Sequence, residues 1–598
     1  MKSSPKDLAT RLASAATFIR KIGAWRFASA LILLLAIPIA VRMALASGIS
    51  WDEEKQLEYG KRLLSWYRSG FTDRSSFTYI DLYLYGGLFD LPAHLVLSSR
   101  CLPWGPYETR HVLTALLAVL GIVAVWMTAN RIAGPRAGLL AGSLLMITPT
   151  WVGHGMFNCK DIPFGVAAAF VAYSTTRIAM RPSPLTWGDA LRAGLSVGCA
   201  LGFRPGGMFL FTYPVLAACA RLAIDAVARR RQGEPLHVIR DGGLAFGRLL
   251  CVLPLTWAIM LVAWPWAQVA PFTRPLQAAA IARHFSWGGV MQFNGGQIST
   301  DHIPASYLPI WFKVTLPDIY LLAVVCAVLV FATIRARKLC ISRALAVAML
   351  VLFVVAPFVG VVVTHPIIYD AHRHFLFLMP AMATLAGLAI DSFISGTRIP
   401  RAFRLVMVAL LIGLSSVVVY DMRGLHPYEY IYFNRLSGGL RRQANRFETD
   451  YWGLTYREGF DWVVHNVDPG HSKKILVFAC NANGQLRYYR TRWRARRFVV
   501  EEKSDQAQIH LAMLRGECRE AAGNVIHTVE RQGVPLLYVR ERGDSQPRGS
   551  YVDSCRHCTW TSHSLECDCR TASGDFGPTS VRLPCHDISN SDGRLKCN

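Results

Sequence analysis

Long apolar runs fill the first 420 positions of the chain, and short polar stretches separate them. A helix needs about 20 apolar residues to cross the hydrocarbon core of a bilayer. The pattern predicts eleven spanning helices, near residues 27–46, 112–130, 137–153, 163–179, 190–203, 207–225, 244–265, 316–333, 344–363, 375–395 and 403–420. We therefore expect a polytopic α-helical membrane protein.

The first apolar run follows a basic N-terminal segment, as it would in a signal peptide. No convincing cleavage site follows this run, and many further runs come after it. We therefore interpret 27–46 as an uncleaved first helix, with residues 1–26 in the cytoplasm.

The chain carries 64 Lys and Arg against 39 Asp and Glu, a net charge of +25. Nucleic-acid binding is one reading of such an excess. However, most of the basic residues fall in alternate loops, as the positive-inside rule describes. These residues are Arg131, Arg136, Arg221, Arg229, Arg230, Arg231, Arg240, Arg335, Arg337, Lys338, Arg398, Arg401 and Arg404. We expect no nucleic-acid partner, and we expect a bacterial inner-membrane protein with a periplasmic C-terminus.

The polar C-terminal third predicts two further parts. Residues 421–541 have the pattern of a mixed α/β domain, with a helix near 457–467 and strands near 474–480, 497–501 and 534–539. We expect residues 542–598 to form a linker and a small tail that holds six cysteines: Cys555, Cys558, Cys567, Cys569, Cys585 and Cys597. An even, dense set of cysteines predicts disulfides and an oxidising compartment, which agrees with a tail outside the cytoplasm.

The first outer loop begins with an acidic pair, Asp52-Glu53, directly before an amphipathic segment at 54–69. We expect this segment to be a helix at the membrane interface. A carboxylate at a membrane surface could take a proton from an acceptor hydroxyl or hold a metal bound to phosphate. The same pair could instead serve only as the cap of the helix, because acids favour a helix N-terminus.

Other charged residues stand on the same predicted side of the membrane. Lys160 and Asp161 lie in the second outer loop, and Arg204 lies in a very short turn. A fourth segment holds Arg373 and His374. Cations here could bind phosphate, although a loop ion pair or interfacial anchoring would also explain them. Together, the cations and carboxylates suit a phosphorylated lipid donor, since cations stabilise a leaving phosphate.

The acidic pair in a long first loop resembles the GT-C class of glycosyltransferases, and glycosyltransferase family 39 in particular. Similar strings begin at Asn158, His365, His426 and Asp450. The resemblance implies a polyprenyl-phosphate sugar donor, inversion at the anomeric carbon, and Asp52 as the base with Glu53 beside it. It also implies phosphate binding by residues such as Lys160, Arg204, Arg373 and Arg110. The second loop lacks the paired acids of oligosaccharyltransferases, but a divalent metal is left open.

The tail resembles one repeat of a cyanovirin-N homology domain, a small β-rich lectin fold. The likeness rests on 549–556 and on the closing Asn590-Ser-Asp-Gly-Arg-Leu595. It implies a Cys555–Cys569 disulfide, with Cys558–Cys567 and Cys585–Cys597 as further pairs. The family uses two repeats, so a second copy of this chain could complete the fold as a homodimer. A disulfide-stapled appendage without a ligand is the alternative.

Three functions remain open on the sequence alone. The first is an enzyme that moves a sugar from a lipid-linked donor to a glycan, protein or lipid acceptor outside the cytoplasm. The second is a transporter of lipid-linked sugars, which would place ionisable residues at mid-membrane depth. The third is a membrane-anchored sugar-binding protein, which would leave most of the spans unexplained. The outer-loop position of the charged residues favours the enzyme.

Overall fold

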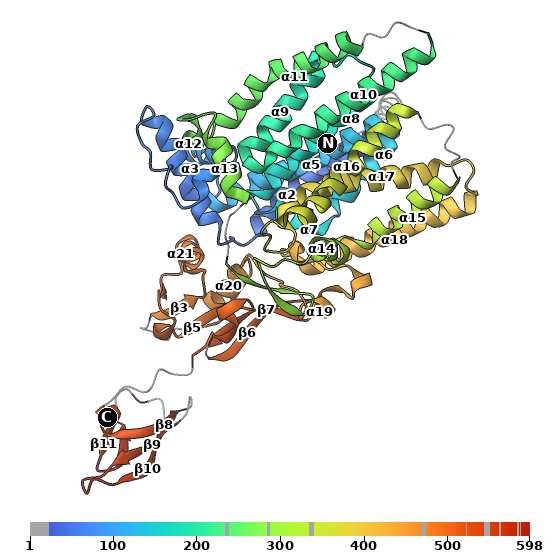
Figure 1. The fold of residues 1–598 in the computed structure, drawn as a ribbon. Helices are drawn as coiled ribbons and strands as arrows, with labels where there is room; N and C mark the ends of the chain where they lie inside the picture. The colour runs from blue at the N-terminus through green and yellow to red at the C-terminus, as the bar shows by residue number, and fades with distance from the viewer. Residues whose placement is uncertain are drawn as a thin grey trace, which may run out of the picture. The chain divides into compact units, whose positions relative to one another are not determined.

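The computed structural model describes residues 23–233, 238–283, 288–333, 340–467, 474–521, 523–542, 550–560, 564–582, 585 and 588–597. The predicted cytoplasmic segment up to residue 22, the basic residues Arg335, Arg337 and Lys338, and most of the linker lie outside these ranges. The chain divides into two compact units, Met1–Thr449 and Asp450–Asn598. The first is a helical bundle, and the second contains the sheets that Figure 1 shows in orange and red.

Eight helices in the described residues are long and apolar enough to cross a membrane. They are α2 (Ala24–Ala46), α5 (Pro106–Ala133), α8 (Asp161–Met180), η2 with α10 (Pro205–Arg231), α11 (Val238–Leu261), α16 (Ile341–Thr364), η4 with α17 (Arg373–Ser395) and α18 (Arg401–Leu425). A ninth candidate is the pair α14 (Tyr307–Thr315) and α15 (Asp318–Thr333), which bends by 101° at a short break. The prediction of a polytopic helical membrane protein is confirmed.

Three of the eleven predicted spans contain no full-length helix within the described residues, and one of them is the run at 316–333, where α15 has 16 residues. The run at 137–153 forms α6 (Pro135–Met146) and α7 (Pro149–Gly155), because Pro149 starts a new helix. At about 1.5 Å per residue, α6 is about 18 Å long and cannot cross a core of about 30 Å. The run at 190–203 forms α9 (Trp187–Phe203), with 17 residues. Each of the eleven predicted runs contains a helix, and within the described residues eight of them, or nine with the bent pair, are long enough to span.

Small residues bring the bundle helices together. A Cβ on Gly387 of α17 would lie 2.6 Å from the backbone of Ala141 in α6. A Cβ on Gly121 of α5 would lie 2.6 Å from the ring of Trp151 in α7. Close approach at small residues is the usual way in which membrane helices pack, because lipid tails provide no hydrophobic drive between them. The short helices α6 and α7 are thus fixed within the bundle.

The first outer loop folds onto the bundle through α3 (Glu53–Arg68), η1 (Leu82–Leu84) and α4 (Asp90–Ser99). The amphipathic helix predicted at 54–69 is present. Its apolar face does not point to lipid, since Tyr59, Leu63 and Leu64 are buried against Leu82, Leu91 and Ala263. Gly60 permits this packing, because a Cβ there would lie 2.7 Å from the carbonyl oxygen of Asp90.

The rest of the first unit consists of short elements near the ends of the long helices. These are α12 (Pro265–Gln268), α13 (Arg274–Arg283), the hairpin β1 (Val290–Phe293) and β2 (Gly296–Ser299), η5 (Glu429–Ile431), η6 (Arg435–Ser437) and α19 (Gly439–Gln443). Residues 421–449 thus fall in the first unit, whereas the sequence groups them with the α/β domain.

The second unit contains a five-stranded mixed sheet in the order β4-β3-β5-β7-β6. Its strands are β3 (Ile475–Ala479), β4 (Phe498–Val500), β5 (Ile509–Met513), β6 (Asn524–Arg531) and β7 (Val534–Glu541). Strand β3 pairs in parallel with β4 and β5, and β7 pairs antiparallel with β5 and β6. Helices α20 (Tyr456–Asn466) and α21 (Asn483–Arg492) accompany the sheet, and a disulfide joins Cys480 to Cys518.

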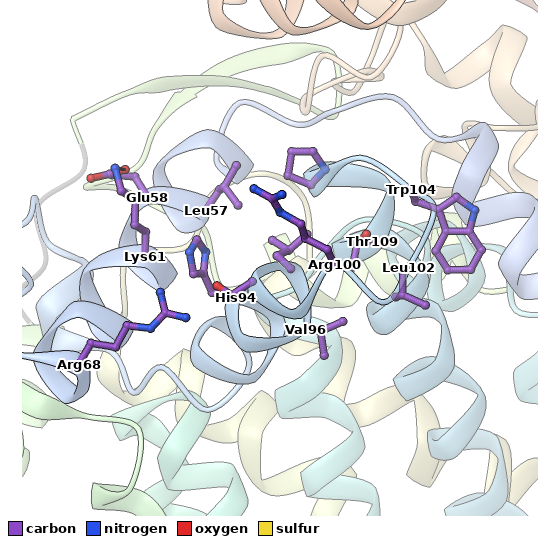
Figure 2. Close-up of a pocket in the computed structure, with 13 residues that line it drawn as sticks. Leu57, Glu58, Lys61, Arg68, His94, Val96, Arg100, Leu102, Trp104 and Thr109 are labelled. Carbon is purple, nitrogen blue, oxygen red and sulfur yellow. Dashed lines mark ion pairs between the residues drawn. The ribbon is translucent and has the colours of Figure 1, made fainter.

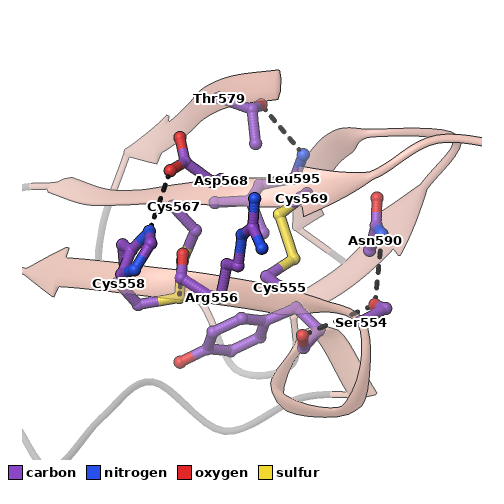
Figure 3. The surroundings of a disulfide bond; sticks show 12 residues. Ser554, Cys555, Arg556, Cys558, Cys567, Asp568, Cys569, Thr579, Asn590 and Leu595 are labelled. Carbon is purple, nitrogen blue, oxygen red and sulfur yellow. Dashed lines mark hydrogen bonds and ion pairs between the residues drawn. A yellow bond between two sulfur atoms is a disulfide. The ribbon is translucent and has the colours of Figure 1, made fainter. Parts of the chain in front are cut away.

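The tail contains a three-stranded sheet and a hairpin. The sheet has the order β10-β9-β8, from β8 (Cys555–Trp560), β9 (Ser564–Arg570) and β10 (Phe576–Arg582), and the hairpin is β11 (Ile588–Ser591) with β12 (Arg594–Cys597). The disulfides Cys555–Cys569, Cys558–Cys567 and Cys585–Cys597 are those that the resemblance implies. Figure 3 shows the first of them bridging neighbouring strands, with Asn590 donating a hydrogen bond to Ser554 at 3.1 Å.

Candidate active site

Four segments from the outer loops meet at one end of the bundle. Asp52 directly precedes α3, and Lys160 and Asp161 stand at the start of α8. Arg204 ends α9, and Arg373 begins the turn that leads into α17. Direct contacts bring these segments together, since Lys160 pairs with Asp52 and Asp161 pairs with both Arg204 and Arg373. We call Lys160, Asp161, Arg204 and Arg373 the outer cluster.

Asp161 is the centre of the outer cluster, and its side chain is 2% exposed. Its carboxylate accepts a hydrogen bond from Arg204, and a second from Arg373 Nη1 at 3.4 Å. The Asn158 amide donates a third bond, at 2.8 Å. The Asn158 side-chain oxygen also accepts a bond of 2.9 Å from the Asp161 backbone amide. Asp161 therefore organises two guanidinium groups, and Asn158 fixes its orientation.

Arg373 is held by residues of its own turn. Asp370 forms an ion pair with Arg373 Nη2 at 3.2 Å, and the guanidinium carbon lies 4.7 Å from the centre of the Tyr369 ring. Asp370 and Ala371 adopt left-handed backbone conformations, with φ of 55° and 60°. Such conformations are uncommon for residues other than glycine and occur often at functional sites. Here they turn the chain so that Arg373 reaches Asp161.

Lys160 connects the outer cluster to the first loop. Its ammonium lies 4.0 Å from Asp52 Oδ2 and 4.9 Å from the centre of the Tyr85 ring. Burial is the largest single effect and disfavours the charged ammonium, but Asp52 and then Tyr85 favour it, and the pKa of Lys160 lies above its usual value. Lys160 therefore stays positively charged at neutral pH, beside Arg204 and Arg373.

The two acids at the start of the first loop lie in different environments. Glu53 is 1% exposed, and its two oxygens contact the Ser50 amide and His111 Nε2, each at 2.7 Å. The Asp52 side chain is 28% exposed, and within the described residues Lys160 is its one ion-pair partner. Asp52 is therefore the carboxylate that an incoming molecule can reach, whereas Glu53 holds the loop to α5.

Arg110 lies outside the outer cluster, whereas His374 lies beside it. Arg110 is fully buried and donates to Asp90 Oδ1 at 2.6 Å and to Cys159 Sγ at 3.1 Å, so its known contacts lie outside the outer cluster. The His374 ring packs edge-on against Tyr369 at 4.8 Å, which places it beside Arg373. Sequence reasoning had predicted both as donor-phosphate ligands.

Two contributors were missed from the sequence. Asn158 orients Asp161, and its spacing of three residues before a helical carboxylate is a recognisable capping pattern. Tyr85 lies under Lys160, but it is separated from it by 75 positions, and no local pattern indicates that contact. Among the described residues, no group of three or more His, Cys, Asp or Glu is placed to hold a metal ion.

Comparison with a protein-family model gives an independent indication of function. Residues 110–257, about a quarter of the chain, match the model for dolichyl-phosphate-mannose-protein mannosyltransferases. The matched segment contains Lys160, Asp161 and Arg204. The match confirms the predicted resemblance to glycosyltransferase family 39, and the chain is a membrane glycosyltransferase. No curated protein matches the chain.

The chain is also similar to several solved structures, including the following three. ArnT from Cupriavidus metallidurans, bound to undecaprenyl phosphate, is 15% identical, with 86% of this chain and 98% of that chain covered and a TM-score of 0.43. The oligosaccharyltransferase AglB from Archaeoglobus fulgidus, in complex with an inhibitory peptide and a dolichol-phosphate, is 13% identical, with coverage of 75% and 62% and a TM-score of 0.40. The Pmt1-Pmt2 complex of S. cerevisiae, bound to its sugar donor, is 14% identical, with coverage of 45% and 39% and a TM-score of 0.28.

Proposed function

We propose that this glycosyltransferase moves a sugar from a polyprenyl-phosphate donor to a hydroxyl acceptor, with Asp52 as general base. The observation that carries the proposal is the 4.0 Å approach of Lys160 to Asp52 at the edge of the outer cluster. It places an accessible carboxylate beside three cations, Lys160, Arg204 and Arg373. A base and an anion-binding group side by side are what transfer from a phosphate leaving group requires.

The donor phosphate binds to the cations of the outer cluster. Asp161 and Asp370 hold the two guanidinium groups in place, so little reorganisation is needed when an anion arrives. The Nε of Arg204 is buried and has no hydrogen-bond partner among the described residues, which leaves it available as a donor to a phosphate oxygen. Lys160 adds a mobile charge at the side that faces Asp52.

The reaction then proceeds as a single displacement. The acceptor hydroxyl gives its proton to the Asp52 carboxylate while its oxygen bonds to the anomeric carbon of the sugar. The bond from that carbon to the phosphate oxygen breaks, and the lipid monophosphate leaves with the electron pair. Lys160, Arg204 and Arg373 stabilise the negative charge that develops on the leaving phosphate. Attack opposite the leaving group inverts the anomeric centre, as the family resemblance implies.

Sugar transfer from a panel of radiolabelled polyprenyl-phosphate sugars tests this function. The wild type should turn over at least one donor, and Asp52→Asn should lose about 10²- to 10⁴-fold in rate, the usual contribution of a general base. Glu54→Gln is the matched control, because Glu54 is an exposed acid two positions away. Folded wild type that transfers no sugar from any donor would contradict the proposal, and so would full activity of Asp52→Asn.

We also propose that the outer cluster and the C-terminus lie on the periplasmic side of a bacterial inner membrane. The positive-inside pattern of the loops and the four disulfides after residue 449 support this side. A C-terminal alkaline phosphatase fusion should be active and a C-terminal green fluorescent protein fusion dark. The reverse result would place the outer cluster in the cytoplasm.

The acceptor and the tail complete the proposal. The acceptor is a glycan, a protein or a lipid, and we propose that the tail binds carbohydrate and pairs with the tail of a second copy. The cyanovirin-like pattern of one repeat where that family uses two supports this assignment. Light scattering of the purified full chain should give a dimer, and deletion of residues 550–598 should give a monomer. A monomeric full chain would exclude the pairing.

A further inference from the structure

A cleft lies on the first outer loop, and none of its lining residues belongs to the outer cluster. It has a volume of about 650 Å³ and opens between α3, α4 and the start of α5. Figure 2 shows Glu58, Lys61 and Arg68 along one side, His94 in the middle and Trp104 at the far end. We call it the interface cleft, because Pro106 and Thr109 on its wall belong to the first turn of the spanning helix α5.

The wall of the interface cleft is basic. Lys61, Arg68 and Arg100 line it together with one carboxylate, Glu58. Glu58 lies 3.5 Å from Lys61 in an exposed pair, which is a weak interaction. Neither Arg68 nor Arg100 pairs with a carboxylate in the part of the chain that the structure describes. Cations without counter-ions around a concave surface attract an anion.

His94 lies inside the cleft and is affected by the same positive charges. Its Nδ1 is buried and makes no hydrogen bond within the described ranges, so a donor or acceptor position remains open there. Burial lowers the pKa of His94, and the positive charges of Arg110, Arg68 and Lys61 lower it further. The imidazole is therefore neutral at pH 7, and the charge of the cleft comes from Lys61, Arg68 and Arg100.

The floor of the interface cleft is apolar. Leu57, Val96, Leu97, Leu102 and Trp104 line it beside the cations. Trp104 stands two residues before α5, where an indole ring typically marks the boundary between hydrocarbon and water. A soluble anion such as free phosphate would leave these side chains without a partner. An anionic head with an attached hydrocarbon chain would contact both the wall and the floor.

We infer that the interface cleft binds an anionic membrane phospholipid, with its phosphate between Arg68 and Arg100 and its upper acyl chain over Leu102 and Trp104. The bound lipid would bridge α3 to the turn between α4 and α5. Since α3 begins one residue after Asp52, the lipid would also hold the proposed base in place. The effect on activity rests on the proposed function, whereas lipid binding does not.

Thermal unfolding of the detergent-purified full chain tests the binding. Phosphatidylglycerol should raise the Tm of the wild type by several degrees, and phosphatidylcholine should raise it much less. Arg68→Glu/Arg100→Glu should remove at least half of the phosphatidylglycerol shift. Arg74→Glu is the matched control and should keep the full shift, because Arg74 is an exposed cation of the same loop outside the cleft.

The remaining outcomes would overturn the inference. An equal phosphatidylglycerol shift in the wild type and in the double variant would place lipid binding elsewhere. An equal rise with glycerol phosphate, which lacks acyl chains, would show a soluble-anion site instead. A second measurement is the number of phosphatidylglycerol molecules retained in native mass spectrometry, which should fall by one in the double variant. Sugar-transfer rates in nanodiscs with and without phosphatidylglycerol then show whether occupancy acts on Asp52.

Discussion

Lys160 Nζ lies 4.0 Å from Asp52 Oδ2, although 108 positions separate the two residues in the sequence. This contact joins the acid of the first outer loop to the cation at the start of α8. The proposed base and the proposed phosphate ligand are thus within one ion-pair distance, while Asp161 and Asp370 are occupied by arginines. In the proposed mechanism, this contact separates the side for the acceptor from the side for the leaving phosphate.

Replacing Lys160 should therefore affect transfer more than folding. The Lys160 side chain is 20% exposed, so Lys160→Gln leaves no large cavity. Loss of one charge that stabilises the leaving phosphate should lower kcat by about 10²- to 10³-fold. Lys160→Arg keeps the charge and should recover part of the rate. Steady-state kinetics with the best donor measures both variants, and a Lys160→Gln enzyme with wild-type kcat would remove Lys160 from the phosphate side.

Asp161→Asn tests whether the outer cluster also contributes to stability. Asp161 is buried between Arg204 and Arg373, so its neutralisation leaves two guanidinium groups without that charge partner. Removing one partner of a buried ion pair typically costs about 3–5 kcal/mol. We expect a lower Tm in detergent. Anionic donor or polyprenyl phosphate should restore part of the lost Tm, because its phosphate replaces the missing charge.

Absence of that rescue would mean that Asp161 holds the loops together and does not prepare a phosphate site. Asp225→Asn is a suitable control. Asp225 pairs with Arg221 on α10, away from the outer cluster, so donor should not rescue any loss of Tm in that variant.

Glu53→Gln tests whether Glu53 contributes to stability and not to catalysis. The glutamine side chain could keep the hydrogen bond from the Ser50 amide, but the charged partner of His111 would be lost. We expect destabilisation of about 1–3 kcal/mol, the usual cost of an impaired buried hydrogen bond. The transfer rate of the folded fraction should stay within a few fold of the wild type. A loss as large as that of Asp52→Asn, with unchanged Tm, would make Glu53 a direct participant.

Much of the fold can be predicted from residue patterns, because a bilayer requires each spanning segment to be apolar along its own length. Apolar runs give the helices, and the clustered tail cysteines indicate disulfides. Two strands of the five-stranded sheet were missed for opposite reasons. Strand β5 is buried at every position but is short and contains His510, and β6 mixes polar and apolar residues and has one buried position. Neither strand alternates clearly enough to be recognised without its neighbours in the sheet.

The candidate site was only partly predictable. Lys160, Arg204 and Arg373 were selected because basic residues are few in the short outer loops, and Asp52 was selected because an acidic pair follows the first span. Their partners are set by tertiary packing. Nothing near Arg110 in the sequence shows that its guanidinium binds Asp90, or that Glu53 turns away to His111. Neighbouring charges in a sequence can therefore serve different ends, one catalytic and one structural.

Gly60→Ala tests whether the position of α3 governs the site. A Cβ at residue 60 would lie 2.7 Å from the Asp90 carbonyl oxygen and 3.3 Å from His94 Cβ, so α3 and α4 must move apart. Such overpacking typically costs about 1–3 kcal/mol. Because Asp52 directly precedes α3, the shift should also displace the base and lower kcat several-fold while donor binding changes little.

Gly243→Ala is the matched control, since nothing lies within 4 Å of a Cβ there and alanine favours the helix by about 0.5–1 kcal/mol. Unfolding curves and transfer kinetics on both variants decide the matter. A Gly60→Ala protein with lower Tm and unchanged kcat would show that α3 supports the fold without setting the geometry at Asp52.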